Sequence, residues 1–156
     1  MRPRKHLIYG CLFAVACYFL FGSAGVGEAL VIWVCSWLII DLDHVVRYSV
    51  KTGSLSPKGF WEWSKKMEKR WRTVPIMEKG KYKSPVFIFH GVESLIVLFL
   101  LGLKWDFFLW CFVGFLFHLI LDWINLYARE ENVLAKVSVI YVLVNNRGKK
   151  GLKRVL

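Results

Sequence analysis

Four apolar runs set the strongest limit on what this chain can fold into. They lie at about residues 7–21, 24–40, 85–103 and 105–124 of a 156-residue sequence that is 56% hydrophobic. A helix needs about 20 mostly apolar residues to cross a bilayer, and it satisfies its backbone hydrogen bonds internally. The sequence therefore predicts an all-α fold: one membrane domain, residues 1–156, built as an integral membrane four-helix bundle.

The first run is short and follows basic residues, so it also fits the apolar core of a signal peptide. We favour a retained helix, because an even number of spans agrees with the distribution of positive charge described next.

Positive charge is confined to the segments between and beyond the apolar runs. Of the 22 Lys and Arg residues, eleven lie in residues 41–84, seven follow residue 125, three lie in the first five residues and one is Lys104. Because positive residues stay cytoplasmic, both termini and the central loop, residues 45–84, should face the cytoplasm of a multi-pass cell-membrane protein. The net charge of +11 then indicates anionic lipid headgroups, at this loop and at the tail, residues 126–156, rather than nucleic acid.

The central loop contains a predicted amphipathic helix that begins at Ser56-Pro57, a capping residue followed by a first-turn proline. Its apolar residues recur at spacings of three, four and four, among Lys and Arg: Phe60, Trp63, Met67 and Trp71. Two placements fit, one in the headgroup region and one over the mouth of the bundle.

Two further features of the sequence do not indicate a function. The apolar segment 133–144 is too short to span, and an interfacial helix, a re-entrant piece and a docked strand all fit it. The four cysteines fall inside apolar runs without a C-x-x-C pair, which predicts buried thiols.

Acids and imidazoles gather near the cytoplasmic ends of the second, third and fourth runs. The groups are Asp41, Asp43 and His44; His90 and Glu93; and His118 and Asp122. An ionisable side chain at the bilayer centre costs about 2.5–3.5 kcal/mol, and spacings of three or four put a pair on one helical face. The predicted topology brings the groups to a similar depth, which predicts a metal site between facing helices. His6, in the basic N-terminus, is expected to be inert.

The expected metal ligands are Asp41, Asp43, His44, His90, His118 and Asp122. Glu93 is the expected general base, and Asp43 is grouped with it as a catalytic carboxylate. Mixed nitrogen and oxygen ligands suit zinc, manganese or iron, and the number of ligands allows one or two ions.

Two of these motifs resemble a known family. Asp41-Leu42-Asp43-His44, after an apolar helix, resembles the opening motif of the predicted membrane-bound metal-dependent hydrolases, which include the LexA-regulated, YdjM-like proteins. The spacing from His118 to Asp122 resembles the H-x-x-x-D motif on that family's last helix. The resemblance implies a small multi-helix membrane protein with a metal-linked hydrolase assignment.

The sequence departs from the family pattern in two places. Ile40 stands where a proline is usual before the first aspartate, and the middle motif, commonly Arg-Gly-x-Thr-His-Ser, is His90-Gly91-Val92-Glu93-Ser94 here. His90 and Glu93 are therefore assigned from spacing alone.

The predicted function is an integral-membrane, metal-dependent hydrolase that acts on a lipid or lipid-linked phosphoester at the cytoplasmic face. Lys81, Lys83 and the basic loop would hold its anionic head. Two alternatives stay open: a divalent metal-ion transporter, and a non-enzymatic membrane adaptor with a structural metal.

Overall fold

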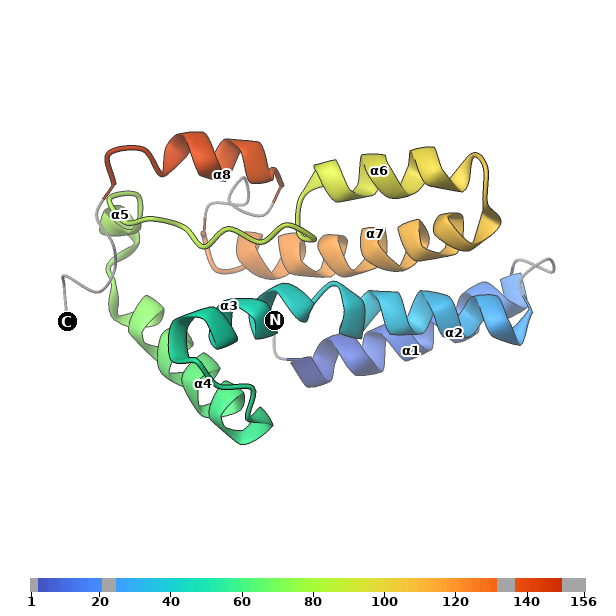
Figure 1. Ribbon diagram of the computed structural model, residues 1–156, viewed down its shortest axis with the longest axis horizontal. Helices are drawn as coiled ribbons and strands as arrows, with labels where there is room; N and C mark the ends of the chain where they lie inside the picture. The colour runs from blue at the N-terminus through green and yellow to red at the C-terminus, as the bar shows by residue number, and fades with distance from the viewer. Residues whose placement is uncertain (1–2, 21–24, 132–136, 150–156) are drawn as a thin grey trace.

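The computed structural model describes residues 3–20, 25–131 and 137–149, with side chains from His6 onwards. In chain order the helices are α1 (Pro3–Leu20), α2 (Val26–Val34), the π-helix η1 (Cys35–Ile39), α3 (Leu42–Thr52), α4 (Pro57–Thr73), α5 (Ile76–Lys79), α6 (Val92–Gly102), α7 (Asp106–Tyr127) and α8 (Val139–Asn145). The described segments contain no β-strand, which confirms the predicted all-α class. Figure 1 shows α1, α2, α6 and α7 side by side in one half of an elongated molecule and α4, α5 and α8 in the other.

The core of the bundle lies where α2 and η1 meet α6 and α7. Its buried side chains are Cys35, Ile40, Leu95, Cys111, Phe115 and Leu119, and a second cluster of Ala14, Cys17 and Ile32 joins α1 to α2. Small residues let the helices approach closely: a Cβ atom at Gly114 would lie 2.6 Å from the carbonyl oxygen of Ile32. Three of the four cysteines are buried, as predicted, whereas Cys11 is exposed.

Two helices are long and apolar enough to cross a bilayer. One runs continuously over Val26–Thr52, through α2, η1 and α3, with 27 residues and a mean hydropathy of 1.8; the other is α7, with 22 residues and a mean hydropathy of 2.0. The helix that contains the second apolar run therefore continues past residue 40 to Thr52. Asp41 lies between η1 and α3, so Asp41, Asp43 and His44 all belong to this one helix.

The third predicted span, residues 85–103, is only partly helical. Residues 83–91 form no helix, and α6 has 11 residues, about 16 Å or half a hydrocarbon core. The backbone explains this: Pro85 has no N–H, and the N–H of Phe89 donates to Asp43 Oδ2 at 2.6 Å instead of to a helical carbonyl. The helix α6 and the apolar segment His6–Leu20 of α1 are each shorter than a full span. Four membrane crossings therefore stay a prediction.

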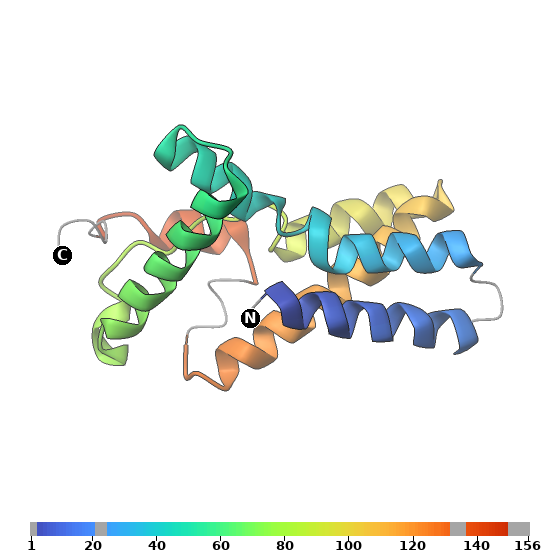
Figure 2. The same cartoon turned by 90° about the horizontal axis from the view of Figure 1, so that it is seen from below.

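The predicted loop helix is α4, and it packs against other parts of the chain. Ser56 caps it by accepting a hydrogen bond from Gly59 N–H. The ring of Tyr48 in α3 contacts the rings of Phe60 and Trp63. Figure 2 shows α3 and α4 next to each other, seen from below. At the other end, Trp71 Nε1 donates to Glu131 Oε2 at 3.1 Å, after the end of α7. These contacts favour the placement over the bundle mouth.

The C-terminal apolar segment forms a short helix, α8, which begins after residue 138 with Ser138 as its cap. Ser84 and Asn146 exchange two hydrogen bonds of 2.8 Å that hold the end of α8 against the segment before α6. Of the three alternatives for residues 133–144, the helix is the one the structure shows; residues 133–136 lie outside the described residues.

Candidate metal site

The Asp41 carboxylate lies among three imidazole rings that come from separate parts of the chain. Its Oδ1 atom is 3.6 Å from Nε2 of His44, 3.5 Å from Nε2 of His90 and 3.9 Å from Nε2 of His118. Asp41 stands at the start of α3, His44 in its first turn, His90 in the turn before α6 and His118 within α7. The predicted convergence of three separate stretches is therefore seen at these residues.

The π turn fixes the tautomer of His118. Its Nδ1 atom lies 2.8 Å from the carbonyl oxygen of Ser36, in η1. Because a carbonyl oxygen only accepts, Nδ1 carries the hydrogen and Nε2 presents its lone pair. That Nε2 is buried and makes no hydrogen bond within the described chain; Asp122 Oδ2 is 3.7 Å away. Its lone pair is available to a cation.

The ring of His90 is likewise oriented through its Nδ1 atom. Its Nδ1 atom lies 3.4 Å from Asp43 Oδ2, the oxygen that also accepts from Phe89 N–H. Its Nε2 is buried and has no hydrogen-bond partner among the described residues. A carboxylate behind a ligating imidazole orients the ring and raises its basicity. The structure thus places Asp43 as an orienting partner of His90 rather than in the position of a ligand.

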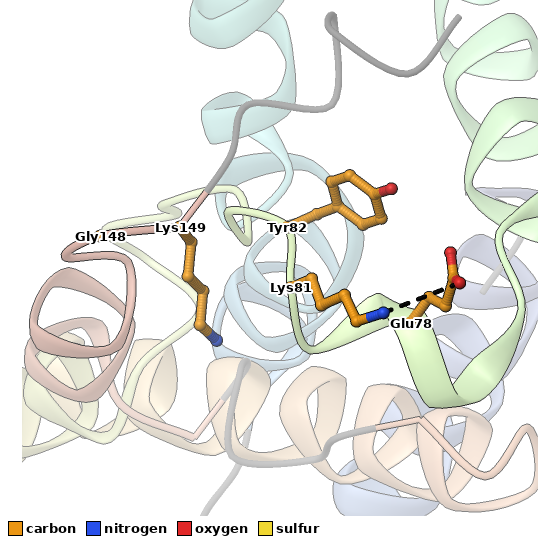
Figure 3. A pocket seen from close by; sticks show the side chains of 5 residues that line it. All are labelled: Glu78, Lys81, Tyr82, Gly148 and Lys149. Atoms are coloured by element: carbon orange, nitrogen blue, oxygen red, sulfur yellow. Dashed lines mark ion pairs between the residues drawn. The ribbon is translucent and has the colours of Figure 1, made fainter.

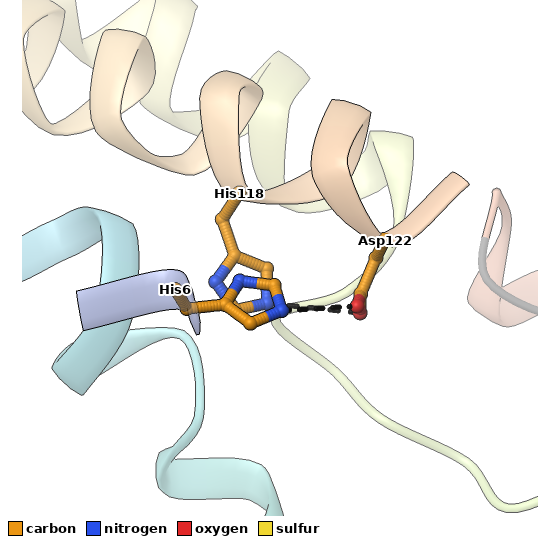
Figure 4. A group of neighbouring side chains, drawn as sticks. All are labelled: His6, His118 and Asp122. Carbon is orange, nitrogen blue, oxygen red and sulfur yellow. Dashed lines mark ion pairs between the residues drawn. The ribbon is translucent and has the colours of Figure 1, made fainter. Parts of the chain in front are cut away.

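His6, which we expected to be inert, belongs to the cluster. It is 2% exposed, its ring stacks on His118 with centroids 4.1 Å apart, and its Nε2 lies 3.4 Å from Asp122 Oδ1. Figure 4 shows Asp122 facing both imidazoles, one from α1 and one from α7. The sequence did hold a signal: like the other groups, His6 stands at the end of an apolar run.

The ligand atoms form two overlapping triplets, His6–His118–Asp122 and Asp41–His90–His118, and within each all three atoms lie within 4.8 Å of one another. Both triplets need the single available Nε2 of His118, because its Nδ1 is engaged by Ser36. The two triplets therefore share one ligand atom and form a single cluster. Ligands about 2.1 Å from a tetrahedral ion lie about 3.4 Å apart, close to the 3.5 and 3.9 Å distances around Asp41.

The chemistry of the donors fits a divalent cation. Two buried imidazole nitrogens without hydrogen bonds face a carboxylate oxygen, and buried polar atoms are rarely left without a partner. Mixed imidazole and carboxylate ligands suit zinc, manganese or iron. The His/Asp cluster can hold a metal ion, whose identity the geometry does not select.

Glu93 lies in the first turn of α6, and its carboxylate contacts the start of α8 rather than the His/Asp cluster. Its carboxylate accepts from Ser138 Oγ at 2.6 Å and from the N–H groups of Val139 and Ile140 at 3.1 Å each. The spacing argument failed because α6 begins at Val92, so His90 and Glu93 do not share a helical face. The structure gives Glu93 a helix-capping contact, and we no longer assign it the role of general base.

Lys81, an expected headgroup ligand, lines a separate hollow of about 450 Å³ together with Glu78, Tyr82, Gly148 and Lys149. Figure 3 shows its ammonium group paired with Glu78. The Nζ and Oε1 atoms of this pair are 3.7 Å apart. No residue of the His/Asp cluster lines this hollow. Lys83 is exposed.

No protein-family model, curated protein or solved structure matches this chain. The resemblance to the YdjM-like hydrolases therefore stays a proposal.

Proposed function

We propose that this chain is a membrane-embedded, metal-dependent hydrolase that acts on a lipid or lipid-linked phosphoester near the cytoplasmic surface. The observation that carries the proposal is the pair of buried, unpartnered Nε2 atoms of His90 and His118 that face Asp41, each ring fixed through its Nδ1. A divalent cation bound here would polarise the phosphoester and acidify a water molecule.

Separate residues would bind the cation and admit the substrate. Asp41, His90, His118 and Asp122 hold the cation, and His6 packs on His118 from α1. The Asp41 and His44 side chains are 28% and 32% exposed, whereas those of His90 and His118 are 1% exposed. The substrate therefore enters at the edge formed by Asp41 and His44.

His44, expected as a metal ligand, belongs to neither ligand triplet, and we assign it instead of Glu93 as the group that moves a proton. Its Nε2 lies 3.6 Å from Asp41 Oδ1, and an imidazole next to the site can take a proton from water.

The exposed surface supports a location in the membrane. Only 28% and 33% of the apolar windows of the Val26–Thr52 helix and of α7 are buried inside the protein. Large apolar side chains face outward on all the helices of the bundle, among them Phe19, Leu30, Leu100 and Phe107. A soluble monomer rarely exposes so continuous an apolar surface. We therefore propose a multi-pass protein with cytoplasmic termini, whose basic loop and tail meet anionic headgroups.

The test combines metal analysis with turnover. Purified protein should contain a stoichiometric divalent cation and release phosphate from phosphatidic acid in mixed micelles. His118→Ala should lose both cation and turnover, whereas His44→Gln should keep the cation and lose turnover. Equal metal content in His118→Ala and wild type would reject the ligand set. Full turnover in His44→Gln would reject the proton-transfer role, and cation flux into liposomes without any turnover would favour the transporter.

A further inference from the structure

An apolar groove lies on the surface of the bundle beside the cation site. It is shallow, has a volume of about 340 Å³ and is lined by Tyr9, Leu12 and Phe13 of α1 and by Phe117 and Leu121 of α7. This size and this aromatic and aliphatic lining are typical of sites for apolar ligands. No charged side chain lines the groove, so its occupant must be apolar over this length.

The groove begins next to the cation site on both helices. Tyr9 lies one helical turn after His6 on α1, while Phe117 and Leu121 directly precede His118 and Asp122 on α7. The lining residues of α1 extend from Tyr9 to Phe13, so the groove begins one turn after His6 and extends toward the apolar half of that helix. An extended molecule can thus place a polar group at the site and an apolar chain in the groove.

The two helices that form the groove, α1 and α7, contact each other at its base. The rings of Phe13 and Phe117 stack in parallel with centroids 4.0 Å apart. Tyr9 and Leu12 are nevertheless 43% and 62% exposed. The groove therefore has a fixed base and an open side, which faces hydrocarbon if the helices lie in a bilayer.

We propose that this groove binds one hydrocarbon chain of the lipid whose phosphoester lies at the cation site; this inference rests on the function proposed above. Burial of methylene groups against five apolar side chains supplies binding free energy remote from the reacting group. A water-soluble phosphoester has no chain to fill the groove, so the groove selects for a membrane lipid.

The experiment measures labelling rather than turnover. The full-length protein, loaded with zinc, is placed in phosphatidylcholine nanodiscs that contain phosphatidic acid with a photoreactive diazirine on its acyl chain. We compare wild type with Leu12→Trp, which fills the groove, and with Val15→Trp, an exposed position of the same helix outside it. Leu121→Trp fills the groove from α7, and far-UV circular dichroism verifies folding.

We expect label on the segments that line the groove, and a labelling affinity about tenfold lower in Leu12→Trp and Leu121→Trp, equal to about 1.4 kcal/mol of binding. Val15→Trp should label like wild type. Equal labelling of the folded Leu12→Trp, Leu121→Trp and Val15→Trp proteins would overturn the groove.

Competition separates this inference from the proposed function. Unlabelled phosphatidic acid should displace the label more effectively than diacylglycerol, which lacks the phosphate, or glycerol phosphate, which lacks the chains. Groove-dependent labelling that diacylglycerol displaces equally well, in wild type and in metal-free His118→Ala, would support the chain site while removing its link to the cation. Displacement by glycerol phosphate alone would overturn the chain site and leave the hydrolase in place.

Discussion

Replacement of Gly114 by alanine tests whether the contact between α7 and the π turn keeps the cation site together. The added methyl group would lie 2.6 Å from the carbonyl oxygen of Ile32, 2.8 Å from Cβ of Cys35 and 3.2 Å from the amide nitrogen of Ser36. Two of these atoms are backbone, so α2 and η1 must move away from α7. Over-packing of this kind costs about 1–3 kcal/mol of unfolding free energy.

The same movement reaches the site, because His118 lies one helical turn after Gly114. It lengthens the 2.8 Å hydrogen bond from His118 Nδ1 to the Ser36 carbonyl and lets the ring rotate. Loss of an orienting partner typically weakens metal binding by about 10–100-fold. We therefore expect a single methyl group, remote from every ligand atom, to lower both stability and cation affinity.

Gly27 provides a matched control within α2, since a Cβ atom there meets nothing within 4 Å. Gly27→Ala should stabilise that helix slightly, by about 0.5–1 kcal/mol. Thermal unfolding followed by circular dichroism in detergent micelles should show Tm lowered by about 2–12 °C in Gly114→Ala, at about 2–4 °C per kcal/mol, and unchanged or raised in Gly27→Ala. Competition with a chromophoric chelator gives the affinities. A Gly114→Ala protein with wild-type Tm and wild-type affinity would refute the reasoning.

Three further substitutions separate ligands from supporting residues. Asp43→Asn should weaken cation binding by about 10–100-fold, since it removes the charge behind His90, and a chelator titration with unchanged affinity would contradict this. Glu93→Gln should loosen α8 by about 1–3 kcal/mol, seen as faster proteolysis after residue 137, with metal content unchanged; loss of the metal would place Glu93 back at the site. Asp122→Asn should lower metal content, whereas Asp106→Asn, an exposed position at the other end of α7, should not; equal content in the two proteins would exclude Asp122 as a ligand.

Apolar runs and capping residues predicted the all-helical class and the cap at Ser56. The shared position of the acidic and imidazole groups at the ends of these runs predicted that Asp41, His90, His118 and Asp122 come together. These predictions were possible because apolar runs and caps are properties of a few neighbouring residues.

The site assignments that we revise share a cause, which is that tertiary contacts place these side chains. Glu93 matched the spacing rule, but the helix begins too late for that rule to apply, and Ser138 supplies a donor from 45 residues away. Asp43 was counted as a ligand, although its oxygen is used by Phe89 N–H and His90. His6 was set aside because of its basic neighbours, whereas the packing of α1 against α7 buries it.

The main-chain carbonyl of Ser36 orients the His118 ring by accepting a hydrogen bond from Nδ1. The side chain of Ser36 takes no part in this contact, because its hydroxyl donates to the Trp33 carbonyl. Side-chain replacement at residue 36 therefore leaves the decisive acceptor in place, so a scan by alanine substitution would miss it. A design that grafts the four cation ligands onto regular α-helices would reproduce every ligand side chain and still leave the His118 ring without its orienting acceptor. Such a design must also copy the backbone of the π-helix at Ser36.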